Sequence, residues 1–140
     1  MEIYKGPCLI VKYEKESNRF VNLWVTSPKS FDELKSEMLE YKSVLEKINP
    51  SQVIFLQKNF KFQMTTEIEV WVAENITNPR LDAGFISESQ DGFHHIAFVV
   101  GQDVLTHMGV MGIFKERSRS VFRPKHFATE LEARNWLDNE

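Results

Sequence analysis

The stretch Ser51-Gln-Val-Ile-Phe-Leu-Gln-Lys-Asn-Phe-Lys-Phe-Gln-Met-Thr-Thr-Glu-Ile-Glu-Val-Trp-Val72 predicts a buried strand, a short loop and the start of a helix. Val53 to Leu56 is a continuous apolar run, typical of a central parallel strand that is covered on both faces. Thr66 and Glu69 match the T-x-x-E capping box, which predicts that Thr66 caps the helix. The free amides at such a helix start lie at the carboxyl end of the strand, where α/β proteins usually place function.

Composition indicates an ordinary globular chain. Of its 140 residues, 42% are hydrophobic and 26% are charged, which suits one domain with one core. The net charge of -3 argues against general nucleic-acid binding, which needs a basic face. No run approaches the ~20 apolar residues that span a bilayer, and the first residues lack the apolar core of a signal peptide. We therefore expect a cytoplasmic protein with no integral membrane segment.

The N-terminal part of the chain predicts a hairpin followed by a helix. Residues 8–25 contain two runs of strand formers, separated by a polar turn at Lys15 to Asn18. The single cysteine, Cys8, lies inside the first run, which favours a buried thiol over a reactive one. Ser30 and Glu33 form a capping box, and Asn49-Pro50 ends the helix. Apolar residues at steps of three and four give this helix its inner face: Phe31, Leu34, Met38, Tyr41, Leu45 and Ile48.

The C-terminal half predicts further strands and helices in alternation. Ile96 to Val100 is an apolar strand, and Val121 to Phe127 is a last strand that Pro124 places at an edge or a bulge. A helix follows each of them: Asp103 can cap the first, and Thr129 and Glu132 form a capping box for the second. Residues 80–92 form a long loop or partly pair with the next strand. The expected fold is α/β, with an N-terminal antiparallel hairpin leading into a mostly parallel sheet of four to five strands. About four helices pack on it, in a single domain over residues 1–140.

Three segments give this order of elements a resemblance to a known family. They are Trp71-Val72, Ala97-Phe-Val-Val-Gly101 and Phe127-Ala-Thr-Glu-Leu-Glu-Ala-Arg-Asn-Trp-Leu137. The last is similar to the F-x-T-E-x-E-A-x-x-W-L ending of SpoIIAA-like proteins. The chain resembles the STAS and SpoIIAA-like group from its first strand to Leu137. The resemblance implies the fold of bacterial anti-sigma-factor antagonists.

The resemblance also implies a site at the start of the second helix. In the antagonists a partner kinase phosphorylates a serine there, within a pattern like D-S-S-G. That pattern falls on Met64-Thr65-Thr66-Glu67, so Thr65 and Thr66 stand at the serine positions, and Met64 and Glu67 replace the aspartate and the glycine. The second interpretation is that Thr66 is a plain N-cap and Thr65 its neighbour.

Two other groups are candidate binding residues. Asn59, Phe60 and Phe62 lie in the loop before this helix, where the rings either form a partner or ligand surface or cover the end of the sheet. Arg117 and Arg119 belong to a basic run over residues 115–125. Such a run favours a phosphate, a lipid headgroup or an acidic partner, or it is a solvated strand edge.

No motif indicates catalysis. The chain lacks the glycine-rich phosphate loops and the nucleophile elbow, and its four histidines lack metal-ligand spacing, so we expect no metal and no cofactor. The sequence predicts a non-catalytic regulatory or protein-interaction module that binds a protein partner through Asn59 to Glu67. The alternative is a small-molecule or lipid-binding protein that uses the aromatic loop and the basic run. Gly109, Gly112 and Pro124 are compatible with a homodimer.

Overall fold

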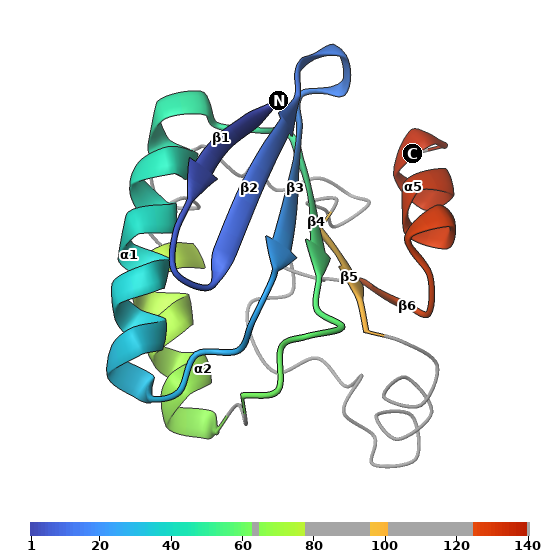
Figure 1. Cartoon of the computed structure of the whole chain (residues 1–140). Helices are drawn as coiled ribbons and strands as arrows, with labels where there is room; N and C mark the ends of the chain where they lie inside the picture. The colour runs from blue at the N-terminus through green and yellow to red at the C-terminus, as the bar shows by residue number, and fades with distance from the viewer. Residues whose placement is uncertain (63–64, 78–95, 101–124, 140) are drawn as a thin grey trace.

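The computed structural model describes residues 1–62, 65–77, 96–100 and 125–139 (Figure 1). Its strands are β1 (Glu2–Lys5), β2 (Leu9–Glu14), β3 (Arg19–Trp24), β4 (Gln52–Leu56), β5 (Ile96–Val99) and β6 (Lys125–Phe127). Its helices are α1 (Phe31–Ile48), α2 (Thr66–Val72) and α5 (Glu130–Asp138). A 3₁₀ turn, η1 (Lys15–Ser17), joins β2 to β3, and α2 continues into a π-helical turn, η2 (Ala73–Thr77).

The strands form one six-stranded sheet in the order β1-β2-β3-β4-β5-β6. β2 runs antiparallel to both of its neighbours, β1 and β3, whereas β3 to β6 run parallel. The α/β class, the N-terminal hairpin and the parallel sheet are therefore confirmed, and β4 lies between two parallel neighbours as its apolar run predicted. β6 is an edge strand, in agreement with the expectation from Pro124, although Pro124 itself lies outside the described residues.

The predicted strand count of four to five was wrong, because β1 adds an antiparallel edge strand. Its four residues, Glu-Ile-Tyr-Lys, are too few to show a clear alternation, and its charged end residues are exposed. Charges on a short edge strand are typical, because they discourage pairing with other chains. The described residues contain three α-helices. The helix predicted after Asp103 lies outside them, as do residues 80–92.

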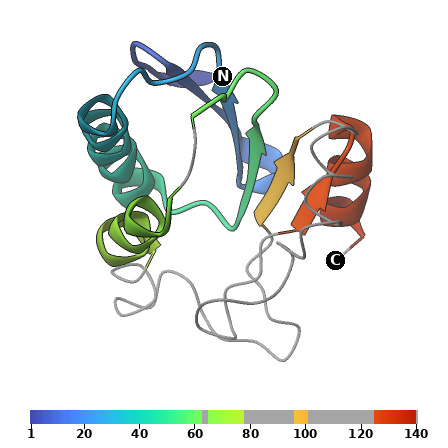
Figure 2. The same ribbon diagram turned by 90° about the horizontal axis from the view of Figure 1, so that it is seen from below.

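Helices cover both faces of the sheet (Figure 2). α1 and α2 lie on one face, and the core beneath them, the α1-side core, is built around Leu9, Phe20, Leu34, Tyr41 and Val53. α5 lies on the other face, where the α5-side core consists of Val21, Ile54, Ala97, Ala133 and Leu137. Successive residues of β3 and β4 alternate between the two cores, as strand geometry requires.

Local signals set the bounds of α1. The Ser30 hydroxyl accepts the Glu33 N–H at 3.1 Å, which confirms the predicted cap. The Glu33 carboxylate, however, accepts the Lys29 N–H at 3.3 Å. At the other end Asn49 adopts a left-handed conformation with φ of 57° and donates its N–H to the Leu45 carbonyl. Asparagine tolerates this conformation better than most residues, so the helix ends at Ile48, two residues before Pro50.

Candidate functional site

The loop after β4 is fixed to its surroundings by backbone hydrogen bonds. The Gln57 N–H donates to the Val99 carbonyl at 2.9 Å, and the Phe60 N–H donates to the Gln57 carbonyl at 3.0 Å. The Lys61 N–H donates to the Ser27 hydroxyl at 3.0 Å. These contacts join the loop to β5 and to the segment before α1. The loop therefore has a defined conformation at the carboxyl end of the parallel strands.

The two phenylalanines of this loop pack inward. The Phe60 ring lies 4.8 Å from that of the buried Trp24, and the Phe62 ring lies 6.4 Å from that of Phe60. Both side chains are half-buried against the α1-side core. Of the two interpretations of these rings, the structure favours the one in which they cover the end of the sheet. Asn59 is exposed, and so are the lysines on either side, Lys58 and Lys61.

The cap of α2 differs from the sequence prediction. The Thr65 hydroxyl accepts the Ile68 N–H at 3.3 Å, and the Thr65 carbonyl accepts the Glu69 N–H, so the N-cap is Thr65 and not Thr66. The predicted Thr66–Glu69 capping box was therefore wrong by one residue. Both threonines could serve as caps on local sequence alone. Thr65 and Thr66 are both exposed.

The remaining predicted site residues lie outside the described part of the chain. They are Arg117 and Arg119, and Gly109 and Gly112 lie outside it too. Among the histidines, only His126 is described, in the middle of β6. Burial lowers the pKa of His126, which favours a neutral imidazole near pH 7.

A buried carboxylate was missed by the sequence analysis. Glu37 of α1 is 4% exposed and accepts the N–H groups of Cys8, at 2.7 Å, and Leu9, at 3.0 Å. It also accepts the Tyr4 hydroxyl. Glu37 lies three residues after Leu34 and next to Met38, so its place beside the apolar stripe was the available signal. These residues, with Gly6, form the Glu37 cluster.

The Glu37 cluster shifts two pKa values upwards. Burial, the hydrogen bond to Glu37 and its negative charge raise the pKa of Tyr4 well above its ordinary value. Burial and the same carboxylate raise the pKa of the Cys8 thiol. Cys8 is therefore a protonated, buried thiol, in agreement with the sequence prediction, and the cluster holds the turn between β1 and β2 on α1.

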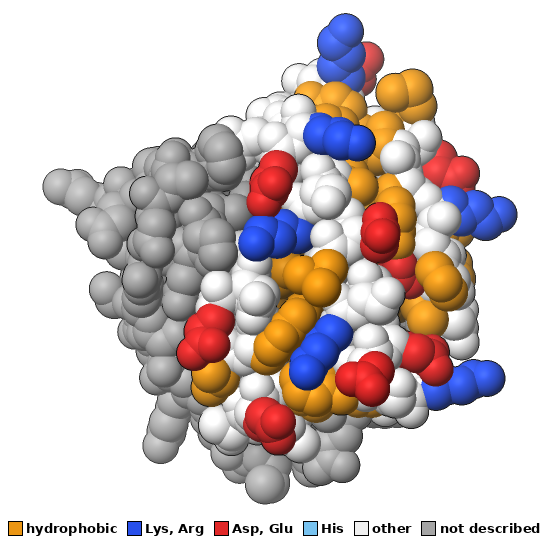
Figure 3. All heavy atoms as spheres, turned by 90° about the vertical axis from the view of Figure 1, so that its left-hand side faces the viewer, with side chains coloured by type: hydrophobic (Ala, Val, Ile, Leu, Met, Phe, Trp, Pro, Cys, Tyr) orange, Lys and Arg blue, Asp and Glu red, His pale blue; other side chains and the backbone are white. Residues whose placement is uncertain are grey.

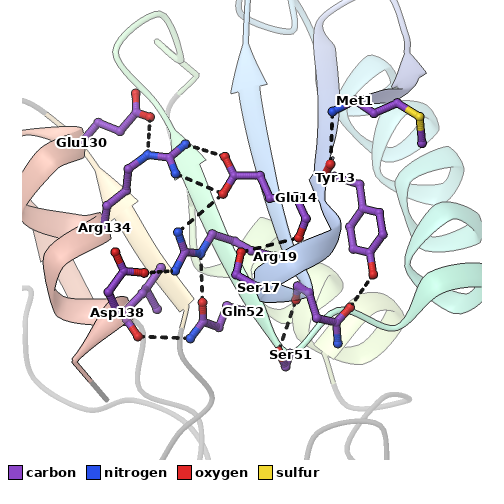
Figure 4. A network of polar contacts seen from close by, with 12 residues as sticks. Met1, Tyr13, Glu14, Ser17, Arg19, Ser51, Gln52, Glu130, Arg134 and Asp138 are labelled. Atoms are coloured by element: carbon purple, nitrogen blue, oxygen red, sulfur yellow. Dashed lines mark hydrogen bonds and ion pairs between the residues drawn. The ribbon is translucent and has the colours of Figure 1, made fainter.

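A second polar cluster joins α5 to the hairpin (Figure 4). The Arg134 guanidinium donates to both carboxylate oxygens of Glu14, at 3.0 and 2.9 Å, and to Glu130 at 2.8 Å. The buried Arg19 donates to Asp138 at 2.6 Å and to the Gln52 side chain at 2.9 Å. The hydrogen bond and charge of Arg134 lower the pKa of Glu14 against the effect of burial. The polar residues of this cluster therefore stabilise the fold by joining α5 to the sheet.

The outer surface of α1 and α2 carries apolar side chains among charged ones (Figure 3). Phe31 and Trp71 meet edge to face at 6.1 Å, and the Lys35 ammonium lies 4.2 Å from the centre of the Phe31 ring. Leu39 is 46% exposed and Val70 is 47% exposed. The cation above the rings covers part of this apolar surface.

The architecture defines an α/β protein whose mixed sheet has helices on both faces. Within the described residues, no three His, Cys, Asp or Glu side chains are arranged to hold a metal ion. The described helices include none long and apolar enough to cross a membrane. Comparison of the chain with protein-family models, curated proteins and solved structures found no match.

Proposed function

We propose that this protein is a non-catalytic regulatory module of STAS or SpoIIAA-like type that binds a protein partner. The binding surface is the loop after β4 together with the start of α2, at residues 59–62 and 65–67. The observation that carries the proposal is an exposed polar turn on a rigid support. Lys58, Asn59 and Lys61 face solvent, while Phe60 between them packs on Trp24.

This geometry favours binding because hydrogen bonds of Gln57, Phe60 and Lys61 hold residues 57–61 in place before a partner arrives. A surface that is already fixed loses less conformational entropy on association, so more of its contact energy becomes affinity. Loops held by a rigid sheet commonly carry the binding residues of α/β proteins. Thr65 and Thr66 add exposed hydroxyls beside the loop. The resemblance to anti-sigma-factor antagonists supports a regulatory role for this position.

The alternative function is small-molecule or lipid binding through the aromatic loop and the basic run. For their full surfaces to contact a ligand, Phe60 and Phe62 would have to leave the α1-side core. Exposing their buried apolar surface to water would then cost about 25 cal/mol for each Å² exposed. Its other residues, Arg117 and Arg119, lie outside the described part of the chain. The loop geometry therefore supports the interaction module better.

A binding experiment with matched surface variants tests the proposal. The test variant is Lys58→Glu with Asn59→Ala and Thr66→Arg, which alters exposed groups and keeps both Phe60 and the Thr65 cap. The control is Lys12→Glu with Asn135→Ala, which changes exposed residues of β2 and α5. Immobilised protein is used to capture partners from extract of the source cells, followed by measurement of affinity with the purified partner.

The proposal expects the same specific partner on the wild type and on the control, with at least tenfold weaker binding to the test variant. Equal affinity for all three proteins would place the interaction elsewhere. Absence of any specific partner, under conditions where the bait is folded, would count against an interaction module altogether.

A further inference from the structure

One row of side chains crosses the sheet on the face that α1 covers. Val11, Asn22, Phe55, Phe98 and His126 are successive partners in the register of β2, β3, β4, β5 and β6. In-register residues of neighbouring strands point to the same face and lie about 5 Å apart. The row therefore brings an amide, two phenyl rings and an imidazole side by side from four strands.

The three rings of the row stack on one another. The Phe55 and Phe98 rings are 5.2 Å apart with an interplanar angle of 21°, and Phe98 and His126 are 5.2 Å apart at 22°. Tyr41 of α1 meets Phe55 edge to face at 5.8 Å. All three stacked side chains are half-buried, whereas Val11 and Asn22 are completely buried. The row thus runs from the closed interior towards partly exposed rings.

The amide of Asn22 lies at the buried end of the row. Its Nδ2 donates to the Tyr41 hydroxyl at 2.6 Å, while Oδ1 is buried and has no hydrogen-bond partner in the part of the chain that the structure describes. With the amide in this orientation, the atom that needs a hydrogen-bond donor is Oδ1. A buried polar atom without a partner destabilises the protein, so a bound group that donates to it would gain free energy.

We propose that this row, with Tyr41, binds a small, flat, uncharged molecule that donates one hydrogen bond to Asn22. Ligand sites are commonly aromatic with a few polar groups that fix orientation, and Asn22 and Tyr41 supply those groups here. Stacked rings favour a planar partner. No residue of the row carries a permanent charge, and burial keeps His126 neutral near pH 7, so a charged ligand would lack a counter-ion. This site is separate from the loop of the proposed function.

Indole and benzothiophene provide a matched pair of probes, because both are flat and of similar size but only indole has an N–H donor. Each is titrated into the full-length, ¹⁵N-labelled protein and followed by heteronuclear NMR. The proposal expects shifts of the backbone amides around Asn22, Phe55 and Phe98. Since one hydrogen bond is worth about 0.5–1.5 kcal/mol, benzothiophene should bind about 2- to 12-fold more weakly than indole.

Three variants complete the test. Asn22→Leu should bind the two probes equally, because it removes the acceptor and retains an apolar side chain of similar size. Phe98→Leu should weaken both, and Phe127→Leu, on the opposite face of the sheet beside Trp136, should leave both unchanged. If Asn22→Leu fails to fold, the comparison of probes on the wild type still decides. Equal binding of both probes to the wild type, shifts confined to the Phe127 face, or no binding up to the solubility limit would each overturn the proposal.

Discussion

The Tyr4 hydroxyl donates a hydrogen bond to the Glu37 carboxylate, although the two residues are 33 positions apart in the chain. This contact joins the edge strand β1 to the middle of α1. The same carboxylate accepts the Cys8 and Leu9 N–H groups, so one buried charge holds both the strand and the turn that follows it. An ionised group is stable in such a place only because these donors replace water.

Replacing Glu37 by Leu should therefore destabilise the fold by about 2–4 kcal/mol, because at least two buried amides lose their acceptor. Urea unfolding followed by circular dichroism gives the free energy of unfolding. Glu40→Leu, on the exposed side of the same helix, is the matched control and should change it by less than about 0.5 kcal/mol. A similar small effect at both positions would contradict the role assigned to the carboxylate.

Gly6→Ala should also destabilise the protein, by about 1–3 kcal/mol. A Cβ at Gly6 would overlap Glu37 Oε2 and the Tyr4 hydroxyl, and would lie 2.8 Å from Tyr4 Cζ. Both side chains are held by their mutual hydrogen bond and cannot move away freely. The effect should be smaller in a Tyr4→Ala background, where two of the three crowding atoms are gone. Additive losses in the double variant would show that crowding is not the cause.

Alkaline pH should weaken the Glu37 cluster through Tyr4. Because the pKa of Tyr4 is higher in the folded than in the unfolded chain, its contribution to stability is complete below the unfolded value near 10 and is lost as pH rises above it. Above pH 10 the unfolding free energy of the wild type should therefore fall relative to that of Tyr4→Phe. Phenolate absorbance supplies the second measurement. Ionisation of Tyr4 near pH 10 in the folded protein would contradict the prediction.

Acid should weaken the contact between the hairpin and α5 through Glu14. The pKa of Glu14 is lower in the folded chain, so its stabilisation is present above the unfolded value of about 4.3 and is lost as pH falls through the folded value. Glu14→Gln should be less stable than wild type at pH 7, and the difference should shrink below about pH 4. The matched control is Glu16→Gln, which changes an exposed residue of η1.

The two threonines at the start of α2 should differ in their effect on stability. Thr65→Ala removes the side chain that accepts the Ile68 N–H and should cost about 0.5–2 kcal/mol. Thr66→Ala places a better helix former at the first helical position and should cost nothing or stabilise slightly. Thermal unfolding of the two variants, side by side, measures the difference. A larger loss of stability in Thr66→Ala than in Thr65→Ala would show that Thr66 is the cap.

Local patterns were sufficient for much of the fold. The apolar run at Val53 to Leu56, the helical spacing from Phe31 to Ile48 and the cap at Thr129 each depend on neighbours in the chain, and each was confirmed, with the Glu132 N–H bonded to the Thr129 hydroxyl at 3.2 Å. The local pattern did not decide whether Thr65 or Thr66 caps α2. Two adjacent threonines offer the same hydroxyl to the start of the helix, and the prediction was wrong by one residue.

The sequence by itself determined the class of fold, because hydrophobic spacing and capping residues act over a few positions and can be recognised in the sequence. Only the tertiary structure decided which polar residues are buried together. Glu37 meets Tyr4, and Arg134 meets Glu14 across 120 positions, through contacts that no local pattern encodes. The register of four strands likewise brings Asn22, Phe55, Phe98 and His126 into one row. Such groupings arise when the sheet assembles, because packing joins residues that are distant in the chain.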